Sequence, residues 1–208
     1  MESRDIVGLG PFGWLGDYPN SLSQALERHK YGVYLWAIRY QDQYLVHYAG
    51  KAMQRTFEVR LKEEDGYYYD SYSRIYDGAR FAQGECVLRW EGNWYRKKDP
   101  RYTPKFQEFK AHEARLAPAR TDMLQALHFL LLPISDQRVD RGPGLDRLAE
   151  RIEATIWDKL KDAGGLAQSF RATRIKMFRR RANDPPAQVT LHLPVPVLGL
   201  ENPCRLEV

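Results

Sequence analysis

Two short motifs, each combining a tyrosine with a glycine, lie close together in the first quarter of the chain. The first is Gly-Val-Tyr at 32–34, and the second is Tyr-Ala-Gly at 48–50, followed at once by Lys51. Arg60 comes twelve residues after the second tyrosine, and Glu153 lies far downstream. A tyrosine hydroxyl can orient a water molecule, a guanidinium can hold phosphate oxygens, and a carboxylate can bind a divalent cation. Hydrolysis of a phosphodiester requires groups of these kinds.

The two tyrosines belong to segments whose patterning predicts a β-hairpin. β-Branched and aromatic residues dominate residues 33–40 and 43–48, and apolar side chains recur at alternate positions. Gln41-Asp42 makes the tight connection, and Gly50 is expected to end the second strand.

The period of two in these strands predicts where the tyrosines point. Tyr34 shares a face with the other even-numbered residues of its strand, and Tyr48 shares a face with Tyr44 and Val46. We expect both tyrosines to project from one side of the sheet and His47 to point to the opposite side.

The arginine belongs to a predicted helix that follows the hairpin. Thr56 can cap this helix, which is expected to run to about Glu64. Phe57 and Leu61 form its buried stripe, and Arg60 lies at the edge of that stripe.

Glu153 belongs to a second predicted helix at 145–160. Its apolar residues recur at helical spacing: Leu145, Leu148, Ile152, Ile156 and Leu160. Glu153 lies beside this stripe, where packing can hold its side chain, whereas Glu150 is expected to face solvent. Glu150 and Glu113 are the alternative carboxylates for a cation.

The pattern as a whole predicts a single domain of the α/β (α+β) class, with a small twisted, mainly antiparallel sheet flanked by helices. Its core is expected at about 30–64 and 120–165. The other predicted segments are an irregular lead-in at 1–20, a helix at 21–30, an aromatic inserted lobe at 65–119, a buried helix at 122–132 stopped by Pro133, a basic extension at 166–208 and, within it, a strand at 189–193.

The composition limits the kinds of binding partner and the cellular compartment that we expect. The net charge is +5 and the pI is about 9.1, which favours an acidic partner. The two cysteines and five histidines show no zinc or disulfide spacing, so we expect a reduced, cytoplasmic setting. No apolar run is long enough to cross a membrane, and we expect no membrane association.

In their order and spacing, the two motifs and the downstream arginine and glutamate resemble the GIY-YIG nuclease superfamily, in particular its restriction and defence-associated members. The resemblance covers residues 31–64 and, for the glutamate helix, 145–160. It implies catalytic roles for Tyr34, Tyr48, Arg60 and Glu153, metal binding by Glu153 and a phosphate contact by Lys51.

The same resemblance implies a metal-dependent endonuclease acting on DNA, with Mg²⁺ as cofactor and Mn²⁺ as a possible substitute. Cutting both strands of duplex DNA would favour a homodimer. The alternatives are a non-catalytic nucleic-acid-binding module, or a nuclease subunit that is active only within a larger complex.

The chain departs from the family pattern at two places. Many members carry histidine or tyrosine four residues after the motif arginine, where this chain has Glu64, so the proton-transfer helper is unassigned. The late asparagine of some members is also unassigned, because neither Asn183 nor Asn202 has a matching context. Tyr34 and Tyr48 could instead be a cross-strand packing pair, and Arg60 a surface partner of Glu64.

Six basic residues crowd into the eleven residues from Arg171 to Arg181, and they include the predicted substrate contacts Arg174, Lys176, Arg179 and Arg180. If they contact phosphates, neutralising three of the arginines should weaken DNA binding and flatten its salt dependence. The log–log slope should fall by about one for each phosphate that is no longer contacted, while cleavage at saturating DNA should change little. Binding titrations over a salt series measure this, and an unchanged slope would identify only a solvated basic segment.

Overall fold

A four-stranded antiparallel sheet with strand order β2-β7-β3-β4 holds the predicted hairpin. Its strands are β2 (Leu9–Gly13), β3 (Tyr31–Tyr40), β4 (Gln43–Ala52) and β7 (Leu127–Ser135). The structure, a computed structural model, describes residues 2–14, 21–136, 144–170 and 186–208. Strand β3 is buried from its first residue through Ile38, because it has a neighbouring strand on each side and packed residues on both faces.

The hairpin forms as predicted, but its second strand continues past Gly50. Tyr34 pairs with Gly50 across the two strands, and the strand runs on to Ala52. Glycine is required here for a different reason: an added Cβ would lie 2.5 Å from the Tyr34 hydroxyl oxygen and 2.8 Å from the Tyr48 ring. Gly50 therefore makes room for the Tyr34 ring over the neighbouring strand.

An irregularity in β4 changes the predicted orientation of its side chains. Trp36 pairs with Tyr48, but the next residue, Ala37, pairs with Val46, so that His47 is an extra residue in β4. Tyr48 thus faces the same side as Tyr34, as predicted, while Val46 faces the other side. The prediction for His47 is wrong, since its ring packs on the Tyr34 side.

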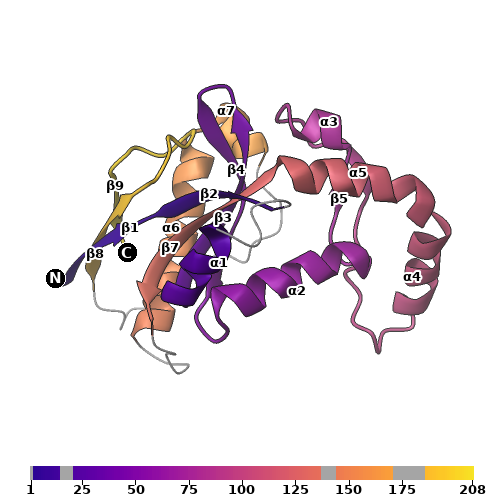
Figure 1. The fold of residues 1–208 in the computed structure, drawn as a ribbon, viewed down its shortest axis with the longest axis horizontal. Coiled ribbons are helices and arrows are strands. Elements are labelled where there is room, and N and C mark those ends of the chain that lie inside the picture. Colours follow the sequence, from indigo (N-terminus) through magenta and orange to yellow (C-terminus); the bar gives the residue numbers. More distant parts are fainter. Residues whose placement is uncertain (1, 15–20, 137–143, 171–185) are drawn as a thin grey trace.

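Two sets of elements cover the two faces of the sheet (Figure 1). One face packs against helix α6 (Leu145–Asp162) and a second sheet made of β1 (Glu2–Val7), β8 (Ala187–His192) and β9 (Cys204–Glu207). The other face packs against α1 (Ser21–Arg28), α2 (Phe57–Tyr69) and the lobe. Short helix α7 (Gly165–Ser169) follows α6. The predicted α/β class, with a mainly antiparallel sheet flanked by helices, is confirmed.

The lobe extends to one side of the sheet, connected to it by α2 and α5 (Figure 1). It contains β5 (Ile75–Tyr76), α3 (Gly78–Phe81), β6 (Leu88–Trp90), α4 (Tyr102–Ala111) and α5 (Glu113–Ala126). Helix α2 reaches into this lobe because it continues beyond the predicted end at Glu64, through Gly66 to Tyr69. The aromatic residues of 65–119 therefore form a packed unit rather than a linker.

Two further sequence predictions are wrong. The apolar run predicted as a helix at 122–132 splits: α5 ends at Ala126, and the following residues form strand β7 in the middle of the sheet. A strand buried on both faces has no polar alternation, so the run could not be distinguished from a buried helix. The lead-in at 1–20 contains strands β1 and β2, which pair with β8 and β7, both distant in sequence.

None of the helices in the described ranges combines the length and the apolar character that a membrane crossing needs.

The close fit of Tyr34 over Gly50 predicts a specific cost of adding one methyl group. Gly50→Ala should destabilise the fold by about 1–3 kcal/mol, because the buried Tyr34 ring and the half-buried Tyr48 ring have little room to shift. The matched control is Gly66→Ala in α2, where an added Cβ meets nothing within 4 Å and should stabilise by about 0.5–1 kcal/mol. Urea unfolding measures both, and equal effects would contradict the proposed fit.

Candidate functional site

The hydroxyl of Tyr34 is the centre of a buried polar network. Tyr34 is fully buried, and its hydroxyl donates to the Glu64 carboxylate at 3.3 Å while it accepts from Arg60 Nε at the same distance. Arg60 also pairs directly with Glu64 at 2.5 Å. Tyrosine, arginine and carboxylate thus satisfy one another at the sheet surface.

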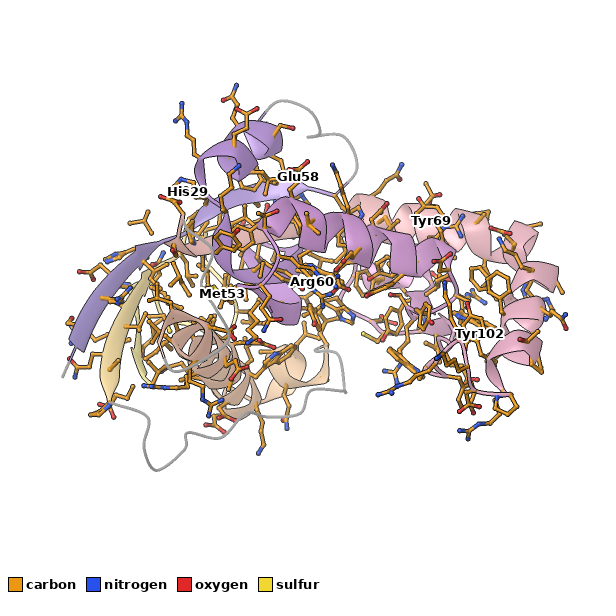
Figure 2. The ribbon with its side chains drawn as sticks, turned by 90° about the horizontal axis from the view of Figure 1, so that it is seen from below. His29, Met53, Glu58, Arg60, Tyr69 and Tyr102 are labelled. Carbon is orange, nitrogen blue, oxygen red and sulfur yellow. The ribbon has the colours of Figure 1, made fainter. Side chains whose placement is uncertain are left out.

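Helix α2 supplies both partners of this tyrosine because of its spacing. Thr56 caps the helix as predicted, accepting from the amide of Val59 at 3.3 Å. Arg60 and Glu64 are four residues apart, so they lie on the same side of the helix. The Arg60 side chain keeps 28% of its surface exposed, and Figure 2 shows it near the middle of the molecule. Both predicted placements of Arg60 are present: it pairs with Glu64, and it lies beside Tyr34.

Tyr48 lies beside Tyr34 but is closer to solvent. The two ring centroids are 6.1 Å apart, and the Tyr48 ring is 4.6 Å from that of Trp36, its cross-strand partner. Tyr48 is half-buried and lines the cavities described below, whereas Tyr34 lies beneath it. The predicted arrangement of both rings on one face, next to Arg60, is present.

Burial sets the ionisation of these groups. It raises the pKa of Tyr34 and of Tyr48 well above the usual range, and the charge of Glu64 raises both further, while Arg60 opposes the shift. Burial also raises the pKa of Glu64, again opposed by Arg60. Near neutral pH both hydroxyls are therefore un-ionised and act as hydrogen-bonding groups.

Glu153 reaches the same region from α6, which packs on the opposite face of the sheet from α2. It is half-buried, and burial raises its pKa to about 7, with Lys51 opposing the shift and Glu150 adding to it. No hydrogen bond or salt bridge joins its carboxylate to any residue in the described ranges. A desolvated carboxylate without such a partner is uncommon and is a typical feature of functional sites.

Lys51 is held by two acidic residues of α6. Its ammonium group lies 2.7 Å from Asp146 Oδ1 and 2.6 Å from Glu150 Oε1. Glu150 also pairs with Arg147 at 2.5 Å, so the prediction that Glu150 faces solvent is wrong. The end of β4 lies against the first turns of α6, which brings these carboxylates to Lys51. Glu153, almost one turn further along the helix, has no ion pair with a described residue.

Two adjoining cavities open along this region. The first, of about 450 Å³, lies among Lys51, Arg55, Arg60 and Glu153, and we call it the carboxylate cavity. The second, of about 300 Å³, extends from Arg60 and Glu64 into the lobe, and we call it the aromatic cavity. Tyr48, Arg60 and Tyr67 line both, so the two cavities share a wall.

The carboxylate cavity fits a hard divalent cation held by one protein ligand. Within the described residues, no group of three histidine, cysteine, aspartate or glutamate side chains converges on a point. Among these same residues, Glu153 is the only carboxylate that lines this cavity, and it has no competing ion pair there. Mg²⁺ is commonly bound through one or two carboxylates, with water and substrate phosphate completing its shell. Glu153 is therefore suited to hold Mg²⁺ or Mn²⁺ in this way.

Two other candidates, Asn202 and Glu113, have structural partners away from the site. Asn202 is structural, since its amide side chain exchanges two hydrogen bonds with the backbone of Leu193. Glu113 pairs with Lys110 in the lobe. Asn183 and the predicted substrate contacts lie outside the described residues: Arg174, Lys176, Arg179 and Arg180.

His47, Asp146 and Tyr67 lie at or near the site but were not predicted there. The extra residue in β4 turns the His47 ring toward the aromatic cavity, where its Nδ1 lies 2.8 Å from the Phe170 carbonyl oxygen. Burial lowers the pKa of His47 to about 4, so its ring is neutral. Asp146 could have been found from its position one helical turn before Glu150. Tyr67 was missed because α2 is longer than predicted.

Comparisons of this chain with protein-family models, curated proteins and solved structures found no match. The assignment of function therefore depends on the residues and on their geometry.

The raised pKa of Glu153 predicts a pH-dependent effect on stability. Between pH 4.5 and about 7 the folded protein keeps a proton on Glu153 that the unfolded chain has lost. The contribution of Glu153 to the free energy of unfolding therefore falls as the pH rises through that window. Glu153→Gln removes the ionisable group, so at pH 8 it should be more stable than wild type by about 1–3 kcal/mol. Near pH 4.5 the difference should disappear.

The matched control is Glu58→Gln, because Lys62 keeps the pKa of that exposed carboxylate below its usual value. This variant should show no gain at pH 8. Thermal unfolding at a series of pH values measures both variants, and a pH-independent effect of Glu153→Gln would contradict a desolvated carboxylate.

Proposed function

We propose that the protein is a metal-dependent endonuclease that hydrolyses phosphodiester bonds in DNA. The observation that supports this most is the placement of Arg60, Tyr48 and Glu153 on the wall of one cavity. The cavity thus combines the Arg60 guanidinium, which can bind a phosphate, with the neutral hydroxyl of Tyr48 and the Glu153 carboxylate, which is suited to a metal ion. The resemblance to GIY-YIG nucleases in residues 31–64 and 145–160 supports the same function.

Arg60 is the group suited to bind the scissile phosphate. Glu64 and the Tyr34 hydroxyl fix its guanidinium, which keeps its orientation without help from the substrate. The exposed part of the side chain faces the cavities. Donors fixed in advance bind a phosphoryl group more tightly as negative charge develops on it. Lys51 is a weaker candidate for phosphate binding, since two carboxylates already neutralise it.

Tyr48 and Glu64 are suited to handle the attacking water and its proton. The Tyr48 hydroxyl is neutral and lines the cavity, so it can orient the water. Glu64 accepts a hydrogen bond from Tyr34, and burial raises its pKa above the usual value of a glutamate, which makes it a stronger base. In our proposal Glu64 is the proton acceptor at the position where related nucleases carry histidine or tyrosine.

Glu153 would hold the cation. A bound Mg²⁺ or Mn²⁺ would supply charge neutralisation on the phosphoryl oxygens and stabilise the leaving oxygen. Because a cation binds the ionised carboxylate, metal binding should displace the proton that Glu153 retains below about pH 7. Metal affinity should consequently rise with pH through that range.

The resemblance to restriction and defence-associated nucleases leads us to propose restriction or host defence as the biological role. Cutting both strands of duplex DNA would favour a homodimer, because two strands need two active sites. The basic segment at 171–181 would add affinity for the DNA backbone.

The direct test compares Glu153→Gln with Glu150→Gln in cleavage of supercoiled plasmid and single-stranded DNA over a Mg²⁺ titration. Glu153→Gln keeps the size of the side chain and removes the charge that holds the cation. It should lower the cleavage rate by about a thousandfold or more and leave DNA binding intact. Glu150→Gln removes one of the two partners of Lys51 and should have a much smaller effect.

Loss of cleavage in Glu150→Gln, with cleavage retained in Glu153→Gln, would assign the metal to the other carboxylate. Absence of cleavage by the wild-type protein on every nucleic acid, together with retained binding, would contradict the nuclease and indicate a binding module.

A further inference from the structure

The aromatic cavity shares Tyr48, Arg60 and Glu64 with the proposed hydrolysis, but most of its lining has no role in that reaction. Its lining is dominated by rings from the hairpin, from the end of α2 and from the lobe: Trp36, Tyr48, Tyr67, Tyr68, Tyr72, Tyr76 and Trp94. Its volume of about 300 Å³ lies at the lower end of the range for small-ligand pockets. A cavity lined in this way is suited to a flat aromatic ligand.

The cavity also contains polar groups, which argue against a purely apolar ligand. Glu64, Ser73 and Arg74 contribute to the lining, together with the neutral ring of His47. A few polar groups in an aromatic wall are typical of sites that hold a flat ligand and fix its orientation by hydrogen bonds at its edge.

The position of the cavity connects it to the phosphate site. Arg60, Tyr48 and Tyr67 line both cavities, so a ligand in the aromatic cavity lies next to a phosphate held by Arg60. In a nucleic acid, a base lies next to each phosphate and is joined to it through the sugar. One nucleotide can therefore occupy both cavities, with its base on the aromatic side.

We infer that the aromatic cavity receives a nucleobase of the substrate strand, unstacked from its neighbours, beside the phosphate bound at Arg60. This inference rests on the proposed nuclease function, whose substrate class it narrows. A base stacked within a perfect duplex cannot enter such a cavity. The substrate is then either single-stranded DNA or a duplex in which one nucleotide is extruded.

Two rings at the rim are suitable for testing this, because they can be removed at little cost to the fold. Trp94 is 50% exposed, with the Arg74 guanidinium 5.9 Å from its ring centre. Tyr72 is half-buried, and its ring centroid lies 5.7 Å from that of Tyr67. Tyr95 lies next to Trp94 in the same loop and does not line the cavity, so it supplies a matched control.

The experiment measures binding of fluorescent oligonucleotides by anisotropy, in EDTA to prevent cleavage. A single-stranded oligonucleotide is compared with an abasic one of equal length, which carries the same phosphates and no bases. Wild type should prefer the base-bearing strand by about five- to a hundredfold, the range for removal of a stacked base. Trp94→Ala and Tyr72→Ala should reduce this preference, and Tyr95→Ala should retain it.

A second arm compares a perfect duplex with a duplex that contains one mismatch. Tighter binding of the mismatched duplex would identify extrusion as a source of the base, because a mismatch lowers the cost of unpairing. Preference for the single strand with no effect of the mismatch would limit the site to single-stranded DNA.

The failure of this inference is distinguishable from the failure of the proposed function. Equal affinity for base-bearing and abasic strands, with Mg²⁺-dependent cleavage by wild type, would overturn only the base site. A base preference that depends on Trp94 and Tyr72, without cleavage under any condition, would overturn only the nuclease. A base preference unchanged in both variants would also overturn the base site. No binding to any of the single-stranded or duplex oligonucleotides would overturn both proposals.

Discussion

The structure depends on burying three polar groups together: the Tyr34 hydroxyl, the Arg60 guanidinium and the Glu64 carboxylate. Each would carry a large desolvation cost alone, and each is acceptable here because the other two satisfy it. The need to keep these three groups in contact determines the sequence and position of the neighbouring elements. Gly50 leaves space for the ring of Tyr34, and α2 must begin at its Thr56 cap so that two side chains four residues apart meet the sheet. A core formed for stability alone would place apolar side chains here.

The charges around this network leave one carboxylate without an ion pair among the described residues. Lys51 is neutralised by Asp146 and Glu150, and Glu64 is neutralised by Arg60. Glu153 lines the carboxylate cavity together with Lys51 and Arg60, and its burial there raises its pKa to about 7. A bound cation would offset the cost of burying the Glu153 charge. The anionic oxygens of a substrate phosphate can bind the cation and Arg60 together, and they would neutralise the remaining positive charge.

Local patterns predicted the hairpin, the α2 cap and the α6 stripe, because alternation and helical spacing are properties of short segments. They predicted Tyr34, Tyr48 and Arg60 as neighbours for the same reason. The predictions that failed concern strands that pair with residues distant in sequence, or strands that are buried on both faces. The apolar run that forms β7 is buried on both faces and has no period, and the N-terminal strands have partners more than a hundred residues away. The extra residue at His47 leaves no mark in the composition of β4, so the position of its ring could not be predicted.

Tyr34→Phe is the measurement that tests the central claim most directly, because it removes one hydroxyl and leaves the packing of the ring intact. Unfolding and Mg²⁺-dependent DNA cleavage are measured on the same preparation. If the network exists to fix Arg60 and Glu64 for catalysis, the free energy of unfolding should fall by no more than about 1–3 kcal/mol, while cleavage falls by about a hundredfold or more. Cleavage equal to that of wild type, or a loss of stability with unchanged cleavage, would show that the tyrosine serves only to pack the sheet.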